Sequence, residues 1–230
     1  PFITDINTVR GQETGYATFN PLRNYGGTTP LARYSEGNLR AQGHSSTKNA
    51  NAVSTLGASS GKWYFEVEMI KLAESIIVTI SNENKSTLRQ LQRVHDRAYA
   101  EYWDGSSWTN LGSGTQYTTG DIVSVAVDID NGKVSFYKNG IIVKKDGTFT
   151  PNGDTFYFGC GQIYDDLDEV RINFGQKPFK FPPPEGFQPL NVANIRPETV
   201  ITHPNKYVGV TTYTGTGSLR NVNVGMQPDL

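Results

Sequence analysis

The stretch GDIVSVAVDIDNGKVSFYKNG, residues 120–140, decides the fold class. Apolar and polar residues alternate on both sides of Asn131-Gly132, and a second Asn-Gly pair follows at Asn139-Gly140. Alternation with a period of two is typical of a half-buried strand. Asn-Gly between two such runs is the strongest short hairpin signal, because both turn residues must adopt positive φ. The stretch therefore predicts antiparallel strands with hairpin tips at these two dipeptides.

Two further stretches carry a similar pattern, GKWYFEVEM at residues 61–69 and VRINFGQKPFKFPPPEGFQPL at residues 170–190. In this order and register, the three stretches resemble the SPRY domain over about residues 61–190. The resemblance implies an all-β fold, an antiparallel concanavalin-like sandwich. It also implies that the protein binds a ligand rather than catalyses a reaction, and that loops at one end of the sandwich form the ligand surface.

Composition agrees with this fold and excludes several classes of function. The 230 residues include 24 Gly, 12 Pro, 12 Tyr and 11 Phe, which is typical of an all-β protein with many turns and aromatic strand positions. A net charge of −1 offers no attraction to nucleic acid. No apolar run approaches the ~20 residues that span a bilayer. We expect no cofactor, no nucleic-acid partner and no membrane insertion. The single cysteine, Cys160, excludes an internal disulfide.

Three segments are expected along the chain. Residues 1–15 form an N-terminal arm, and residues 16–192 form the SPRY-type β-sandwich. Residues 193–230 form a connector and the start, or a shortened remnant, of a second β module, unless the chain is a fragment of something longer.

The last segment resembles the opening of a module that occurs in bacteriophage virion proteins. The resemblance rests on TYTGTGS at residues 212–218 and on the closing GMQPDL at residues 225–230. Strands are expected at residues 207–213 and 219–224. Because a lone hairpin is marginal in water, these strands are expected to be disordered or to pair with another surface, such as a neighbouring subunit.

The segment ENKSTLRQLQRVHDRAYA, residues 83–100, breaks the period of two. Arg89, Arg93 and Arg97 recur at every fourth position, which places them on one face of a helix. A short helix and a long ordered loop both fit this pattern.

Glu66 and Glu68 are the best catalytic candidates, because residues two apart on a strand point to the same face. Retaining glycosidases need two carboxylates roughly 5 Å apart. Some concanavalin-like glycosidases add a third acid, whereas Met69, Ile70 and Lys71 follow here. We therefore expect a solvated strand face and no catalytic residue.

Two acidic clusters could suggest a hard-cation site. Asp128, Asp130 and Asn131 fail the calcium-loop spacing, and a hairpin turn explains them. The run YDDLDEV at residues 164–170 is more open, although a solvated acidic loop is commoner than a cation site. The three histidines lack metal-ligand spacing, so no metal site is expected.

A binding surface has better candidates than an active site. Aromatic residues crowd around the Asp104-Gly105 turn, and such residues near a hairpin tip can stack on sugar rings or anchor a protein partner. The acidic loop after residue 163 belongs to the loops that the SPRY resemblance implies. The expected ligand-binding residues are Tyr102, Trp103, Asp104, Trp108, Tyr164, Asp165 and Asp166.

Three functions compete. We expect a bacteriophage virion component, a tail, fibre or capsid-decorating protein, that serves host attachment or assembly. Its partners would be other virion proteins and a host surface receptor or glycan. The protein would be located in the virion and would form a homo-oligomer. The alternatives are an intracellular SPRY adaptor that binds a protein target and a concanavalin-like carbohydrate-active enzyme. The adaptor would be expected with an attached RING, B-box or SOCS-box segment, which these residues do not display.

Overall fold

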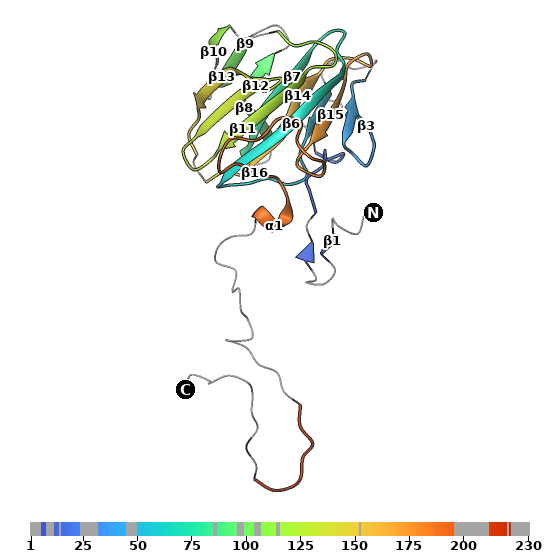
Figure 1. Cartoon of the computed structure of the whole chain (residues 1–230), viewed down its shortest axis with the longest axis vertical. Coiled ribbons are helices and arrows are strands. Elements are labelled where there is room, and N and C mark those ends of the chain that lie inside the picture. The colour runs from blue at the N-terminus through green and yellow to red at the C-terminus, as the bar shows by residue number, and fades with distance from the viewer. Residues whose placement is uncertain are drawn as a thin grey trace. The chain divides into compact units, whose positions relative to one another are not determined.

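The computed structural model divides the chain into two units, residues 1–195 and residues 196–230, and shows an all-β first unit (Figure 1). Strands β1 (Ile6–Asn7) and β2 (Gln12–Glu13) pair with each other, and α1 (Val192–Ile195) is a single short helix. The structure describes residues 6–7, 12–13, 15–23, 32–44, 50–84, 87–95, 99–103, 107–113, 116–151, 153–195, 212–219 and 221.

The larger sheet has eight strands, in the order β13-β12-β11-β6-β15-β4-β3, with β16 pairing in parallel with β6. The other pairs of this sheet are antiparallel. Its strands are β3 (Arg33–Ser35), β4 (Arg40–Gln42), β6 (Lys62–Lys71), β11 (Ile122–Asp128), β12 (Lys133–Lys138), β13 (Ile141–Thr148), β15 (Glu169–Asn173) and β16 (Gln188–Pro189).

The smaller sheet has six antiparallel strands, in the order β10-β9-β8-β7-β14-β5. Its strands are β5 (Ala50–Val53), β7 (Ile76–Asn84), β8 (Thr87–His95), β9 (Tyr99–Trp103), β10 (Trp108–Ser113) and β14 (Phe156–Ile163). The two sheets together form the antiparallel sandwich that the sequence predicts.

Alternation along β6 explains how the core forms. Phe65, Val67 and Met69 belong to the buried core, whereas Glu66 and Glu68 face the other way. The ring of Phe65 lies 5.6 Å from that of Phe158 in β14, so aromatic side chains join the two sheets.

Both expected hairpin tips are present, but the two turns differ. Asn139 and Gly140 have φ of 47° and 79° and form a two-residue turn between Lys138 and Ile141, as expected. The other connection has four residues, Ile129 to Gly132, because Asp128 pairs with Lys133. Gly132 has positive φ and Asn131 does not, so the expectation of two positive φ values was wrong there.

The expectation of a helix or loop after residue 83 was wrong. Residues 87–95 form β8, which pairs with β7 and β9. Arg89 and Arg93 therefore lie in a strand, and Arg97 lies outside the described residues. Pairing on both sides of β8 overrides the weak helical spacing, because strand preference depends on neighbouring strands.

The proposed domain boundaries stay a prediction. Most of the two strands expected after residue 206 lies outside the described residues. Residues 212–219, which the structure does describe, are not assigned to a strand.

Candidate functional site

The carboxylate of Glu66 anchors a segment that crosses the outer face of the larger sheet. We call residues 179–184 the strap. Glu66 accepts hydrogen bonds from the backbone N–H of Lys180 at 2.9 Å and of Phe181 at 2.8 Å. Glu66 is only 4% exposed, so the expected solvated face was wrong for this residue. A buried carboxylate whose oxygens are engaged in this way has a structural role.

Tyr64 completes the anchor of the strap. Its hydroxyl has one proton, which is shared between two acceptors, Glu66 Oε1 at 3.4 Å and the carbonyl oxygen of Phe181 at 3.3 Å. Its ring packs edge-on against Phe179, with centroids 4.8 Å apart. Burial raises the pKa of the Tyr64 hydroxyl, so the group stays a hydrogen-bond donor at neutral pH.

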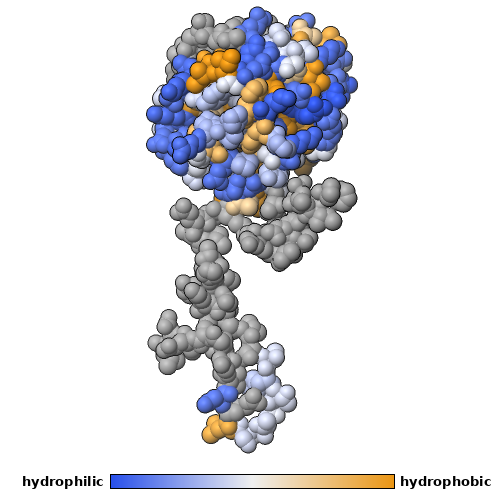
Figure 2. All heavy atoms as spheres, viewed as in Figure 1, coloured by the Kyte–Doolittle hydropathy of each residue, from blue (hydrophilic) through white to orange (hydrophobic). Residues whose placement is uncertain are grey.

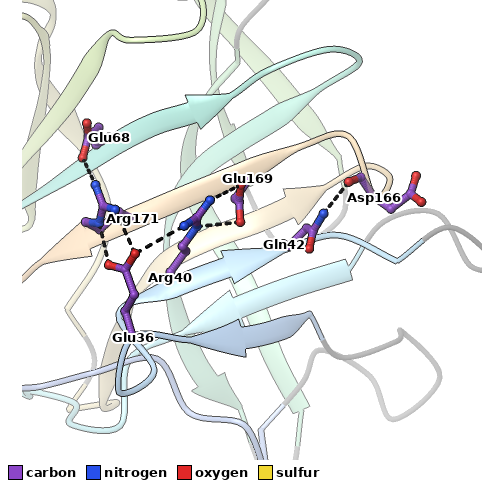
Figure 3. Close-up of polar contacts among 7 residues, drawn as sticks. All are labelled: Glu36, Arg40, Gln42, Glu68, Asp166, Glu169 and Arg171. Atoms are coloured by element: carbon purple, nitrogen blue, oxygen red, sulfur yellow. Dashed lines mark hydrogen bonds and ion pairs between the residues drawn. The ribbon is translucent and has the colours of Figure 1, made fainter.

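Glu68 belongs to a row of charges on the same outer face, drawn in Figure 3. Arg171 donates to Glu68 at 2.9 Å and to both oxygens of Glu36, at 2.8 and 2.9 Å. Arg40 forms a bidentate pair with Glu169, both bonds being 2.6 Å. The hydrogen bond from Arg171 lowers the pKa of Glu36 to about 2. Each of these partly exposed carboxylates is paired with an arginine, so none is left unpaired to act as a general acid or base.

Two carboxylates hold the turn after β11. They are Asp128 and Asp130, which the sequence analysis compared with a calcium-binding loop. Asp128 accepts hydrogen bonds from the backbone and side chain of Asn131 and pairs with Lys62 at 3.3 Å. Asp130 accepts a bond from the Gly61 N–H at 2.8 Å. The hairpin explanation of these residues is therefore consistent with the structure. In the part of the chain that the structure describes, no group of three or more His, Cys, Asp or Glu is placed to hold a metal ion.

The acidic loop that follows β14 is fixed by a buried carboxylate. Asp168 is fully buried and accepts three backbone N–H bonds, from Ala73 at 2.8 Å and from Glu74 and Ser75 at 3.0 Å each. These bonds tie the β14–β15 connection to the β6–β7 connection. Asp168 is thus a structural member of the acidic run rather than a surface charge.

Contacts with β4 fix the same loop from the other side. The side chain of Gln42 donates to the carbonyl oxygen of Asp166 at 2.6 Å (Figure 3). The backbone of Gly43 lies so close to Asp165 that a Cβ at Gly43 would collide with the Asp165 carbonyl. The loop therefore presents Leu167, which is 46% exposed, beside Asp165 and Asp166. The sequence analysis did not identify Leu167, because only the fold leaves this leucine outside the core.

The residues expected to bind ligand do not all lie together. Tyr102 and Trp103 lie in β9 and pair with Thr109 and Trp108 of β10. Trp103, the last residue of β9, lies at the end of the sandwich toward which β7 runs, because β9 runs in the direction of β7. Asp104 lies outside the described residues.

Tyr164, Asp165 and Asp166 lie at the opposite end. They follow β14, which ends beside Ile76, the first residue of β7. The strand directions thus separate the aromatic hairpin from the acidic loop.

A pocket of about 310 Å³ was also missed by the sequence analysis. It lies between the strap and the turn that joins β12 to β13. Tyr64, Tyr137, Ile141, Phe181, Pro182 and Pro184 contribute to its lining. No local pattern in the run FPPPEG, residues 181–186, indicates that the fold places it over the outer face of the sheet.

Comparison with known proteins identifies the fold family. A family model described as the SPRY domain matches residues 62–177. The chain belongs to the SPRY family. SPRY domains are generally non-catalytic modules of protein interaction, which agrees with the structural roles of Glu66 and Asp168.

Animal proteins are among the relatives of this SPRY chain. The Ran-binding proteins 9/10 homolog of Drosophila melanogaster is 27% identical over 144 residues, which cover 60% of this chain and 15% of that protein. Ran-binding protein 9 of Xenopus laevis is 30% identical over 159 residues, 64% of this chain and 28% of that protein. The chain thus spans less than a third of the length of these relatives.

A solved SPRY structure has the same fold. The crystal structure of the SPRY domain of human HERC1 superposes with a TM-score of 0.51 at 16% sequence identity. The match covers 70% of this chain and 99% of that one. Within the described residues, no helix is long and apolar enough to span a membrane.

Proposed function

We propose that the chain is a non-catalytic module that binds a partner protein through the loop of residues 164–167. The single observation that carries the proposal is the rigid presentation of Leu167 beside two acidic side chains at one end of a SPRY sandwich. The loop is held in place by Asp168 and Gln42, so binding requires little ordering of the loop itself. An exposed leucine next to carboxylates suits a partner segment with an apolar residue flanked by basic ones.

The relatives favour the adaptor interpretation over the virion interpretation. They are animal proteins named for binding Ran, and nothing in them points to a virion. The virion location, the host receptor and the homo-oligomer remain predictions from the sequence without further support. The enzyme interpretation is weakened because Glu66 and Glu68 are both engaged in structural contacts.

A peptide selection tests the proposal. A random peptide library is selected on the immobilised chain. Ran is tested separately as a candidate protein ligand, and the affinity of each ligand is measured by fluorescence anisotropy. Leu167→Asp should weaken binding about tenfold or more, as expected for an anchor residue at the centre of an interface. Asp165→Asn with Asp166→Asn should weaken binding of basic peptides and reduce its dependence on salt.

Leu22→Asp is the matched control. Leu22 is 91% exposed, and its neighbour Asn20 donates a hydrogen bond to Val53 at the C-terminal end of β5. Because β5 and β14 are antiparallel and Ala50 pairs with Ile163, Val53 lies at the end of the sheet opposite to Tyr164. Leu22 is therefore a control at the other end of the sandwich. Ligands that bind the Leu167→Asp protein as tightly as the unmodified protein would refute the assignment of the loop.

A further inference from the structure

Small residues of β11 separate the two tyrosines that line the pocket beside the strap. Ser124 and Ala126 lie on the outer face of the larger sheet, because they alternate with valines of the core. Ala126 pairs across the strands with Tyr64 of β6, and Ser124 pairs with Tyr137 of β12. A hollow between the two tyrosines follows from this difference in side-chain size.

Both walls of the pocket are held in place. The strap is held by its anchor on β6, as described above. In the turn, the side chain of Asn139 accepts a hydrogen bond from the Ile122 N–H at 2.9 Å and donates one to Asp121 at 2.7 Å. Gly140 has φ of 79°, and a Cβ there would approach Cδ1 of Phe181 to 2.7 Å, so the turn and the strap are in close contact. A pocket with fixed walls can accept a side chain with little ordering of its own.

The lining favours an uncharged ligand. Its described members are all of uncharged types, namely Tyr64, Tyr137, Phe181, Pro182, Pro184 and Ile141, with Asn139 and Gly140 of the turn. Burial raises the pKa of the Tyr64 and Tyr137 hydroxyls, so both are uncharged at neutral pH. Lys138, which precedes the turn, pairs with Asp121 at 3.0 Å. A charged group in this pocket would lose hydration without gaining an opposite charge from the lining.

Size and ring content favour an aromatic group among uncharged ones. The volume of about 310 Å³ is the share of roughly ten water molecules in the liquid, so a small aliphatic side chain would fill only part of it. Three aromatic rings contribute to the lining. Aromatic pairs in edge-on or offset contact gain more than their buried area alone provides.

Apolar side chains surround the mouth of the pocket. Ile141 lines the pocket and is 74% exposed, and Pro182 of the strap is also exposed. Figure 2 shows an orange, apolar patch on the flank of the sandwich where Figure 1 draws β13. A free ring compound would leave this rim in water, whereas the residues that flank an aromatic side chain in a partner protein would cover it.

We propose that the pocket is a second interaction site, which takes the aromatic side chain of a partner protein. The ring fills the pocket against Tyr137 and Phe181, and uncharged residues on either side of it in the partner cover Ile141 and Pro182.

This site does not depend on the loop of residues 164–167. In the larger sheet, β11 and β6 lie between β12, which carries Tyr137, and β15, the strand that the loop enters. The two proposals can therefore fail separately.

Small probes test the kind of group that the pocket takes. The N-acetyl amides of tryptophan, tyrosine, phenylalanine, leucine and lysine are titrated into the ¹⁵N-labelled full chain, and NMR follows the amide signals of Gly140, Ile141 and Phe181. We expect at least one aromatic probe to shift these signals and to bind about three- to tenfold more tightly than the leucine probe. The lysine probe should not bind.

A peptide separates the side chain of a partner from a free ring compound. The peptide Ser-Thr-Trp-Thr-Ser has blocked ends, and its central residue is replaced by Tyr or Phe if that probe binds best. We expect it to bind roughly threefold or more tightly than the corresponding N-acetyl amide, because its flanking residues contact the rim.

Four variants locate the binding. Tyr137→Ala should weaken binding of the best probe about fivefold or more, whereas Tyr137→Phe keeps the ring and should bind within about twofold of the unmodified chain. Ile141→Ala changes an exposed residue that the fold does not need, and it should weaken peptide binding roughly two- to threefold. Leu22→Ala is the matched control, because Leu22 is 91% exposed and lies outside the lining. It should bind as the unmodified chain does.

Four results would overturn the proposal. The first is that no aromatic probe shifts the signals of Gly140, Ile141 and Phe181. The second is a leucine probe that binds as tightly as the aromatic ones. The third is a peptide that binds no more tightly than the free amide, which would assign the pocket to a small molecule. The fourth is self-association of the free chain that Ile141→Ala abolishes, which would assign it to a second copy of the chain.

Discussion

Replacing Glu66 by Gln should detach the strap from the outer face of the sheet. The carboxylate of Glu66 accepts two backbone N–H bonds, from Lys180 and Phe181, and a third from the Tyr64 hydroxyl. A glutamine in the same position offers one acceptor oxygen and an NH₂ group. The NH₂ group faces one of the two N–H donors, so that donor is left unsatisfied in a buried place.

The expected loss of stability follows from these contacts. A hydrogen bond to a charged group contributes about 1.5–3 kcal/mol, and a neutral one about 1 kcal/mol. Losing one charge-assisted bond, and weakening the other, should lower the free energy of unfolding by about 2–3 kcal/mol. That is a large share of the roughly 5–15 kcal/mol that holds a typical domain.

Glu68→Gln is the matched control, because Glu68 lies two residues along the same strand on the same face. Its side chain is 41% exposed and pairs with Arg171, so its loss should cost no more than about 1 kcal/mol. Urea unfolding measures both free energies, and amide hydrogen exchange measures the protection of Lys180 and Phe181. Equal destabilisation by the two variants, or unchanged protection of these amides in Glu66→Gln, would refute the reasoning.

Three further predictions concern other buried or paired groups. Asp168→Asn should lower the free energy of unfolding by about 2–3 kcal/mol, since it weakens three backbone bonds to a buried carboxylate; urea unfolding checks this. Burial raises the pKa of the Cys160 thiol, so a thiol reagent at pH 8 should react with Cys160 only after the chain unfolds. The pKa of Glu36 is lowered to about 2 from 4.5, so its pairs with arginine stabilise the fold above pH 4.5 and lose that effect as the pH falls toward 2. The difference in stability between Glu36→Gln and the unmodified chain should therefore shrink from pH 6 to pH 2; a constant difference would contradict it.

Local patterns predicted the elements with the strongest signals. β11 and β12 and the Asn139-Gly140 turn follow from alternation and from the positive φ that an Asn-Gly pair allows. The turn at Asn131-Gly132 was predicted only in position. Its length depends on Asp128, whose carboxylate bonds to Asn131 and closes a four-residue connection. β8 was missed because its strand character comes from pairing with β7 and β9.

The proposed binding loop and the strap could be predicted only in part. The acidic loop at residues 164–166 was found from its composition, but its separation from the β9–β10 hairpin required the strand directions. No local sequence pattern identified Leu167, Ile141 or the strap as surface features. An apolar or proline-rich run has the same sequence whether the fold buries it or leaves it exposed.

The sequence by itself determined antiparallel strands joined by tight turns, because side-chain alternation and turn chemistry act between residues close along the chain. Its resemblance to the SPRY domain implied the sandwich. It also placed Glu66 and Glu68 on one face of one strand. Only the tertiary structure decided that Glu66 anchors the strap and that Glu68 pairs with Arg171. The residues that bury Glu66 lie 114 and 115 positions further along the chain, and burial depends on what packs above a residue rather than on its neighbours in sequence.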